Sequence, residues 1–145
     1  MAGIGADLTK FFSEDIKKEK ESKKEMSSES TIPALLFKAR NDAHITHLIN
    51  KDRTMATHKA LEAFYEAVVD LADGFIETSL VWYPVDDICV EESCCIKNPT
   101  QYFKDLYSQI DKLRGKYKES FLQNQIDEMQ TLISQTIYRL TYMTT

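Results

Sequence analysis

Apolar residues recur every three or four positions along most of the chain, which is the spacing of an amphipathic helix. This pattern predicts four helices, over residues 32–50, 55–81, 100–118 and 120–143. Pro33 in the first predicted turn and Thr54 just before the second helix agree with these limits, because both residue types favour helix starts. The positions expected to face the core are Leu36, Ala39 or Ala43, and His47; then Leu61, Phe64, Val68, Leu71, Phe75 and Leu80; then Phe103, Leu106, Ile110, Leu113 and Tyr117; and finally Leu122, Ile126, Met129, Ile133, Ile137 and Leu140.

Four helices of this kind predict an all-α protein built as a four-helix bundle. The first two helices are joined by a short turn, as are the last two, so each pair should be antiparallel. The connection between the second and third helices has about 17 residues, which at roughly 3.3 Å per extended residue can span a helix of about 30 Å. Such a crossover is typical of the ferritin-like arrangement, whereas an irregular surface loop is the alternative that length alone leaves open.

Residues 1–30 have a different pattern from residues 31–145, which we expect to form the bundle. Apolar residues at helical spacing in residues 7–16 predict a short amphipathic helix, and the charged stretch that follows predicts a solvated helix or a disordered spacer. Residues 17–24 carry five lysines against two glutamates, although residues 1–30 as a whole have a net charge of −1. DNA or a virion protein is therefore a candidate partner of this arm, while a flexible arm is the simpler interpretation.

Composition narrows the class of protein. A chain of 145 residues suits one domain with a substantial core, and only four glycines and three prolines favour helices. A net charge of −5 argues against a protein that coats nucleic acid through general electrostatics. We find neither an apolar run of about 20 residues nor a secretory leader, so we expect no membrane span and a cytoplasmic location. Cys89, Cys94 and Cys95 are expected to be reduced thiols rather than a disulfide framework or a zinc site.

The candidate chemistry lies in and after residues 44–58, which contain all three histidines. His58, Glu62, Asp73 and Glu77 fall at about 0°, 40°, 60° and 100° around a helix axis, so they share one stripe. The 15 residues from His58 to Asp73 correspond to about 22 Å along the helix, so one metal ion cannot bind both ends within one chain. Two copies packed antiparallel about a two-fold axis would bring the ends together, and His47 would lie beside His58.

The segment HLINKDRTMATHKALEAFYEAVVDLADGFIE resembles the Dps family of DNA-binding mini-ferritins. Counted from His58, the matching positions are Glu62 at +4, Tyr65 at +7, Asp73 at +15 and Glu77 at +19. The resemblance implies an inter-subunit ferroxidase site made by His47, His58 and Glu62 of one chain with Asp73 and Glu77 of another. It also implies a hollow shell of twelve subunits, built from two-fold dimers, that oxidises Fe(II), stores ferric mineral and protects DNA. Zinc or manganese could occupy the same ligands.

A second resemblance covers residues 33–143 and points to small helical proteins of tailed bacteriophages. That family shares the pattern of two histidines followed by an aspartate and a glutamate, so both resemblances can hold. It supports a different function, a non-enzymatic bundle that serves the virion or contacts the host and keeps a degenerate metal site. The alternative for Glu62, Asp73 and Glu77 is a solvated stripe without metal. His44 matches no ligand position, so we expect a solvated or core-satisfied side chain there.

Overall fold

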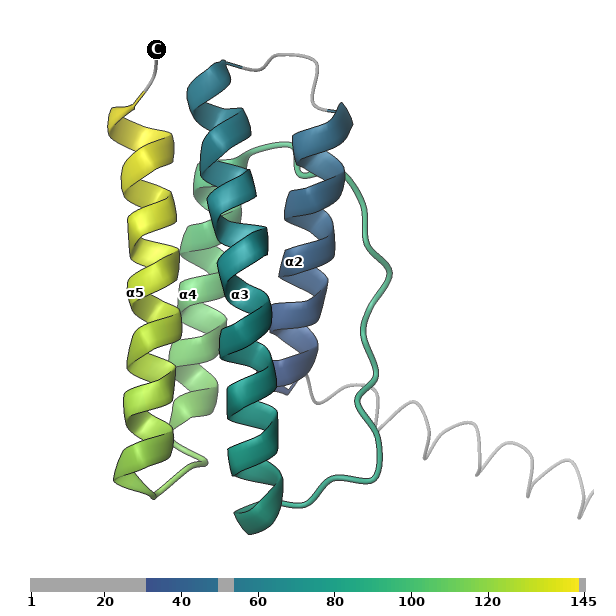
Figure 1. Cartoon of the computed structure of the whole chain (residues 1–145), viewed down its shortest axis with the longest axis vertical. Coiled ribbons are helices and arrows are strands. Elements are labelled where there is room, and N and C mark those ends of the chain that lie inside the picture. Colours follow the sequence, from purple (N-terminus) through teal and green to yellow (C-terminus); the bar gives the residue numbers. More distant parts are fainter. Residues whose placement is uncertain (1–30, 50–53, 144–145) are drawn as a thin grey trace, which may run out of the picture. The chain divides into compact units, whose positions relative to one another are not determined.

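The computed structural model describes residues 31–49 and 54–143, and these residues form four helices and no strand (Figure 1). The helices are α2 (Ile32–Ile49), α3 (Met55–Trp82), α4 (Pro99–Arg114) and α5 (Ser120–Tyr142). The predicted all-α four-helix bundle is therefore confirmed. The predictions for residues 1–30 and for the turn before Thr54 lie outside the described residues.

The helix limits follow from their capping residues. The Thr54 hydroxyl accepts a hydrogen bond from the backbone N–H of Thr57 at 3.2 Å, and Asn98 caps α4 in the same way. The predicted end of α4 at residue 118 was wrong, because the helix ends at Arg114. Gly115 has a high cost in a helix, and the next two N–H groups bond to carbonyls three residues back, which closes the last turn early.

The bundle has the connectivity of a ferritin-like fold. α2 and α5 run in one direction and α3 and α4 in the other (Figure 1). α3 packs against α2 and α5, and α4 packs against α5 and α2, so every neighbouring pair is antiparallel and α3 lies diagonally opposite α4. The long connection leaves the end of α3 and runs back beside α2 to the start of α4. The predicted crossover is confirmed, and it is extended rather than helical.

The core contains most of the positions that the apolar pattern predicted. The fully buried large side chains include Leu36, Leu61, Phe64, Phe75, Phe103, Ile110, Leu122, Ile126, Met129 and Ile133. Leu71, Leu113, Tyr117, Ile137 and Leu140 are only partly buried and pack against the edge of the core. The prediction for Leu80 was wrong: this side chain is 37% exposed, because it lies in the last turns of α3, where the bundle ends.

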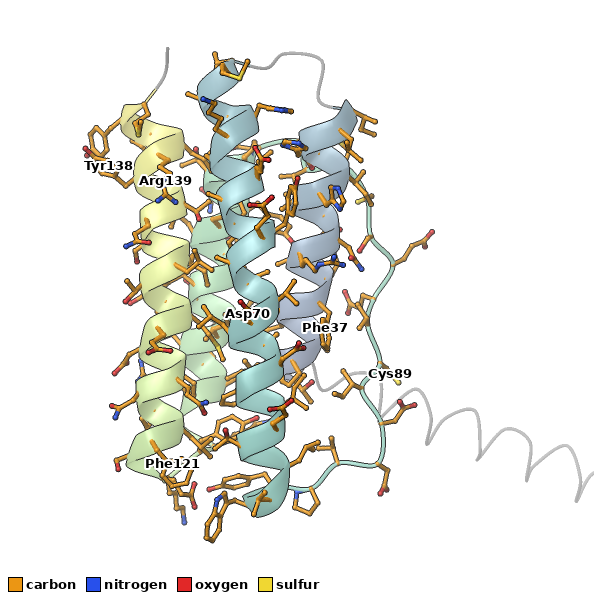
Figure 2. The ribbon with its side chains drawn as sticks, viewed as in Figure 1. Phe37, Asp70, Cys89, Phe121, Tyr138 and Arg139 are labelled. Atoms are coloured by element: carbon orange, nitrogen blue, oxygen red, sulfur yellow. The ribbon has the colours of Figure 1, made fainter. Side chains whose placement is uncertain are left out.

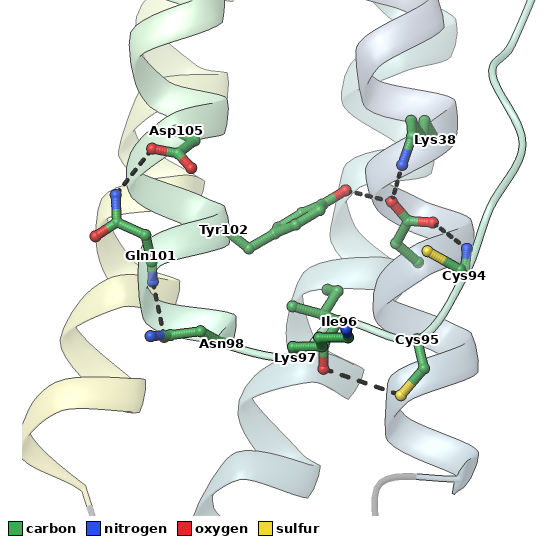
Figure 3. A pocket seen from close by; sticks show the side chains of 10 residues that line it. Lys38, Cys94, Cys95, Ile96, Lys97, Asn98, Gln101, Tyr102 and Asp105 are labelled. Atoms are coloured by element: carbon green, nitrogen blue, oxygen red, sulfur yellow. Dashed lines mark hydrogen bonds and ion pairs between the residues drawn. The ribbon is translucent and has the colours of Figure 1, made fainter.

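Asp42 of α2 anchors the crossover to the bundle. Its buried carboxylate accepts hydrogen bonds from the Tyr102 hydroxyl at 2.7 Å and the backbone N–H of Cys94 at 3.0 Å, and it pairs with Lys38 at 2.5 Å. Figure 3 shows Lys38, Tyr102 and Cys94 converging from α2, α4 and the crossover. One turn further along α2, the Thr46 hydroxyl accepts a second crossover N–H at 2.8 Å. Two residues of α2 therefore hold the end of the crossover in place.

These contacts determine how Asp42 ionises. Burial alone would raise the pKa of Asp42, but the hydrogen bonds from Lys38, Tyr102 and Cys94, with the Lys38 charge, hold it below the ordinary value of 3.8. A carboxylate whose pKa is lower in the folded chain stabilises the fold above the unfolded pKa. That contribution is lost as the pH falls through the folded pKa.

We predict that Asp42→Asn lowers the free energy of unfolding near neutral pH by about 1–3 kcal/mol, because the Tyr102 hydroxyl and the Cys94 N–H lose a charged acceptor while the partly exposed Lys38 stays solvated. The variant should also lose less stability than the natural chain when urea unfolding is repeated from about pH 5 down to pH 2. Asp105→Asn, which changes an exposed carboxylate, should leave both the stability and its pH dependence nearly unchanged. Equal pH dependence in Asp42→Asn and the natural chain would show that this carboxylate is not the anchor.

Candidate metal centre

The end of α2 and the beginning of α3 place two histidines side by side. His47 lies in the last turn of α2 and His58 in the first turn of α3, and the antiparallel packing of the two helices brings these turns together. The imidazole rings stack with centroids 3.7 Å apart and planes inclined by 19°. Two residues that are 11 positions apart therefore form one unit.

Each imidazole is held by the backbone of the other histidine. Nδ1 of His47 lies 2.9 Å from the carbonyl oxygen of His58, and Nδ1 of His58 lies 3.2 Å from that of His47. A carbonyl only accepts hydrogen bonds, so each Nδ1 carries the proton and donates it. In the neutral ring the lone pair then lies on Nε2, which is the arrangement commonly seen in histidines that bind metals.

Glu62 completes a group of three. It follows His58 by one helical turn, so both side chains leave α3 on the same side. One ligand atom from each of His47, His58 and Glu62 lies within 4.8 Å of the other two, and the group is buried to half-buried. Ligands about 2.1 Å from one ion are separated by roughly 3–4.2 Å, so a small inward movement suffices. These three side chains could hold a metal ion.

Asp73 and Glu77 do not join this group within the chain. Both are exposed on α3, one or more turns beyond the middle of the helix. Asp73 lies about 22 Å and Glu77 about 28 Å from His58 along the helix axis, so one chain cannot bring all five predicted ligands to one ion. Their contribution from a second copy stays a prediction.

The third histidine has a different environment. The His44 ring stacks on Tyr65 with centroids 4.3 Å apart, and Tyr65 meets the His47 ring edge-on at 5.2 Å. His44 is not one of the three grouped side chains. Burial and the charges of Glu62 and Glu66 raise the pKa of Tyr65, so its phenol stays protonated. The ring stack was not foreseen, because it depends on the register between α2 and α3.

Comparison with known proteins places these residues in one family. A family of unknown function, DUF5856, matches residues 47–140, which begin at His47 and extend into α5. The chain belongs to the DUF5856 family. No curated protein and no solved structure matches it. The DUF5856 description assigns no activity, so the function has to be argued from the site.

A cavity of this DUF5856 member lies away from the histidines. It has a volume of about 370 Å³ and is lined by residues of α2, the crossover and α4, among them Lys38, Cys94, Cys95 and Tyr102 (Figure 3). Cys89, Cys94 and Cys95 are free thiols on the crossover, and none belongs to the His47–His58–Glu62 group. No described helix is long and apolar enough to span a membrane.

We predict that Zn(II), used as a redox-inert probe, raises the melting temperature of the protein. An ion that binds only the folded chain adds about 2.7 kcal/mol when its free concentration is 100 times the dissociation constant. Glu62→Gln should reduce the shift, whereas Glu66→Gln, which changes an exposed carboxylate one turn later, should preserve it. If Zn(II) leaves the melting temperature of the natural chain unchanged, or shifts it equally in the two variants, the result would count against a metal centre at His47, His58 and Glu62.

Proposed function

We propose that this DUF5856 protein is a Dps-like iron-binding protein with ferroxidase centres shared between two copies of the chain. The observation that carries the proposal is the convergence of His47, His58 and Glu62 with both Nδ1 protons held by carbonyl oxygens. Two imidazoles and one carboxylate with open coordination positions form a donor set that suits Fe(II), and zinc or manganese could compete for it. The ferritin-like connectivity of the helices supports the same assignment.

The centre has room for ligands from a second copy. Asp73 and Glu77 are exposed on the α3 stripe that also carries His58 and Glu62. A two-fold axis near the middle of α3 would bring Asp73 and Glu77 of a second copy opposite the three grouped ligands, twice in each dimer. The completed set would hold three carboxylates and two imidazoles.

The proposed reaction uses Fe(II) as its substrate. One hydrogen peroxide molecule takes up two electrons and two protons to form two water molecules, and two Fe(II) ions supply the electrons. Carboxylates favour the product, because hard oxygen anions bind Fe(III) more strongly than Fe(II). Consuming Fe(II) and peroxide together would protect DNA, and a shell of twelve copies would store the ferric product.

The alternative of a non-enzymatic bundle in a virion places its partner contact in residues 1–30. Those residues lie outside the described part of the chain, so this alternative stays a prediction of the phage resemblance. Deleting residues 1–30 should abolish partner association under that alternative, and should leave Fe(II) oxidation intact under our proposal.

We predict that the purified protein oxidises Fe(II) faster than buffer does when peroxide is added. His58→Ala combined with Asp73→Ala should slow this reaction by about tenfold or more, because even groups that only orient metal ligands have effects of that size. His44→Ala combined with Asp70→Ala removes the same residue types from outside the proposed centre and should keep most of the activity. A protein that stays monomeric and leaves the oxidation rate at the buffer value would refute the proposed function.

A further inference from the structure

One side of α3 carries a row of five carboxylates against one cation, Lys59, which lies within the same arc, so this side has an excess of negative charge. Its five carboxylates lie within an arc of about 80° around the helix axis, and Figure 2 shows one of them, Asp70, on the outward side. Four of the five are exposed and the fifth is half-buried. No lysine or arginine in the described part of the chain pairs with any of them, since the ion pairs there are Lys38–Asp42 and Arg114–Asp127. The carboxylates are Glu62, Glu66, Asp70, Asp73 and Glu77.

Apolar side chains border this row. Tyr65, Val69 and Ile76 are half-buried, and Leu80 is 37% exposed. Their positions around α3 fall between about −20° and 40°, beside the carboxylates. The surface therefore combines an apolar strip, which favours contact with another protein, with charges that oppose contact with an identical surface.

The repulsion between these charges acts directly against the dimer that the proposed function requires. A two-fold axis presents the same surface on both copies, so the carboxylates of one α3 would face those of the other. Like charges that face each other destabilise an interface. Neither Lys59 of α3 nor Arg40 of α2 forms an ion pair with these carboxylates in the described part of the chain, and five carboxylates outnumber the one lysine in their arc.

We propose that metal binding controls the docking of a second copy on this surface. Without metal, the two acidic rows repel each other and the copies associate weakly. Each bound divalent ion turns Glu62 of one copy and Asp73 and Glu77 of the other into its ligands, which neutralises charge and joins the copies. This inference rests on the proposed function, because it uses the same shared centre. By linkage, association of the copies must strengthen metal binding by the same factor.

Sedimentation of the full chain at several protein concentrations tests this inference directly. The dimer dissociation constant in EDTA is compared with that in Zn(II), which binds the centre without redox chemistry. We expect Zn(II) to lower it by about tenfold or more, within the usual range of coupling between sites. Higher salt in EDTA should also tighten association, because it screens the repulsion between the rows.

Two matched variants separate ligation from simple charge removal. The first double variant combines Asp73→Asn with Glu77→Gln, and the second combines Glu66→Gln with Asp70→Asn. Each of them removes two negative charges from α3. Both variants should dimerise more tightly than the natural chain in EDTA. Only the variant that keeps Asp73 and Glu77 should tighten further with Zn(II).

Equal association of the natural chain in EDTA and Zn(II), including a stable oligomer in EDTA, would overturn the inference. If the chain forms a stable oligomer in EDTA and metal analysis finds zinc bound to it, the proposed ferroxidase survives alone. Absence of bound zinc would remove both proposals. A Zn(II) response that is unaffected by Asp73→Asn with Glu77→Gln would also overturn it, because those residues would not be the shared ligands.

Discussion

Two backbone carbonyls orient the imidazoles on which the functional proposal depends. The His47 carbonyl lies in the last turn of α2, where a helix has carbonyls with no donor of their own, and Nδ1 of His58 donates to it. The His58 carbonyl lies in the first turn of α3 and accepts from Nδ1 of His47. The same pair of hydrogen bonds closes the α2–α3 corner and selects the ring nitrogen that can bind metal. Structure and candidate chemistry thus share one pair of interactions.

The rest of the fold supports this corner and leaves its outer side open. Asp42 and Thr46 tie the crossover to the flank of α2 that faces α4. α5 and α2 cover two other sides of α3. Among the described residues, no helix covers the stripe with Glu62, Asp73 and Glu77, of which the last two are exposed. An exposed row of ligands beside an apolar strip is understandable as the surface where a second copy completes the centre.

The sequence was most informative where short-range periodicity determines structure. The placement of His58 and Glu62 on one side of α3 follows from one helical turn, and the two helix starts follow from the capping side chains of Thr54 and Asn98. The pairing of His47 with His58 needed the register between two helices as well. That register depends on the packing of Tyr65 and on the carbonyl contacts, which no local pattern contains.

Longer-range features could not be predicted in this way. The three partners of Asp42 include Cys94 and Tyr102, which are 52 and 60 residues further along the chain, so only the folded crossover reveals a buried carboxylate hub. The early end of α4 follows from Gly115 and from the bonding of the next turn, which the apolar pattern alone would have continued through Tyr117. Leu80 fits the apolar period of α3 but lies where the neighbouring helices no longer cover it.

The central claim is that each centre takes ligands from two chains, and mixing two inactive variants tests it most directly. His58→Ala and Asp73→Ala chains would be combined in equal amounts without metal, allowed to exchange, and then supplied with Fe(II) and peroxide. Random pairing makes half of the dimers mixed, and each mixed dimer has one centre with all its ligands intact, so about one quarter of the natural activity should return. A mixture no more active than its two components would contradict a centre shared between chains.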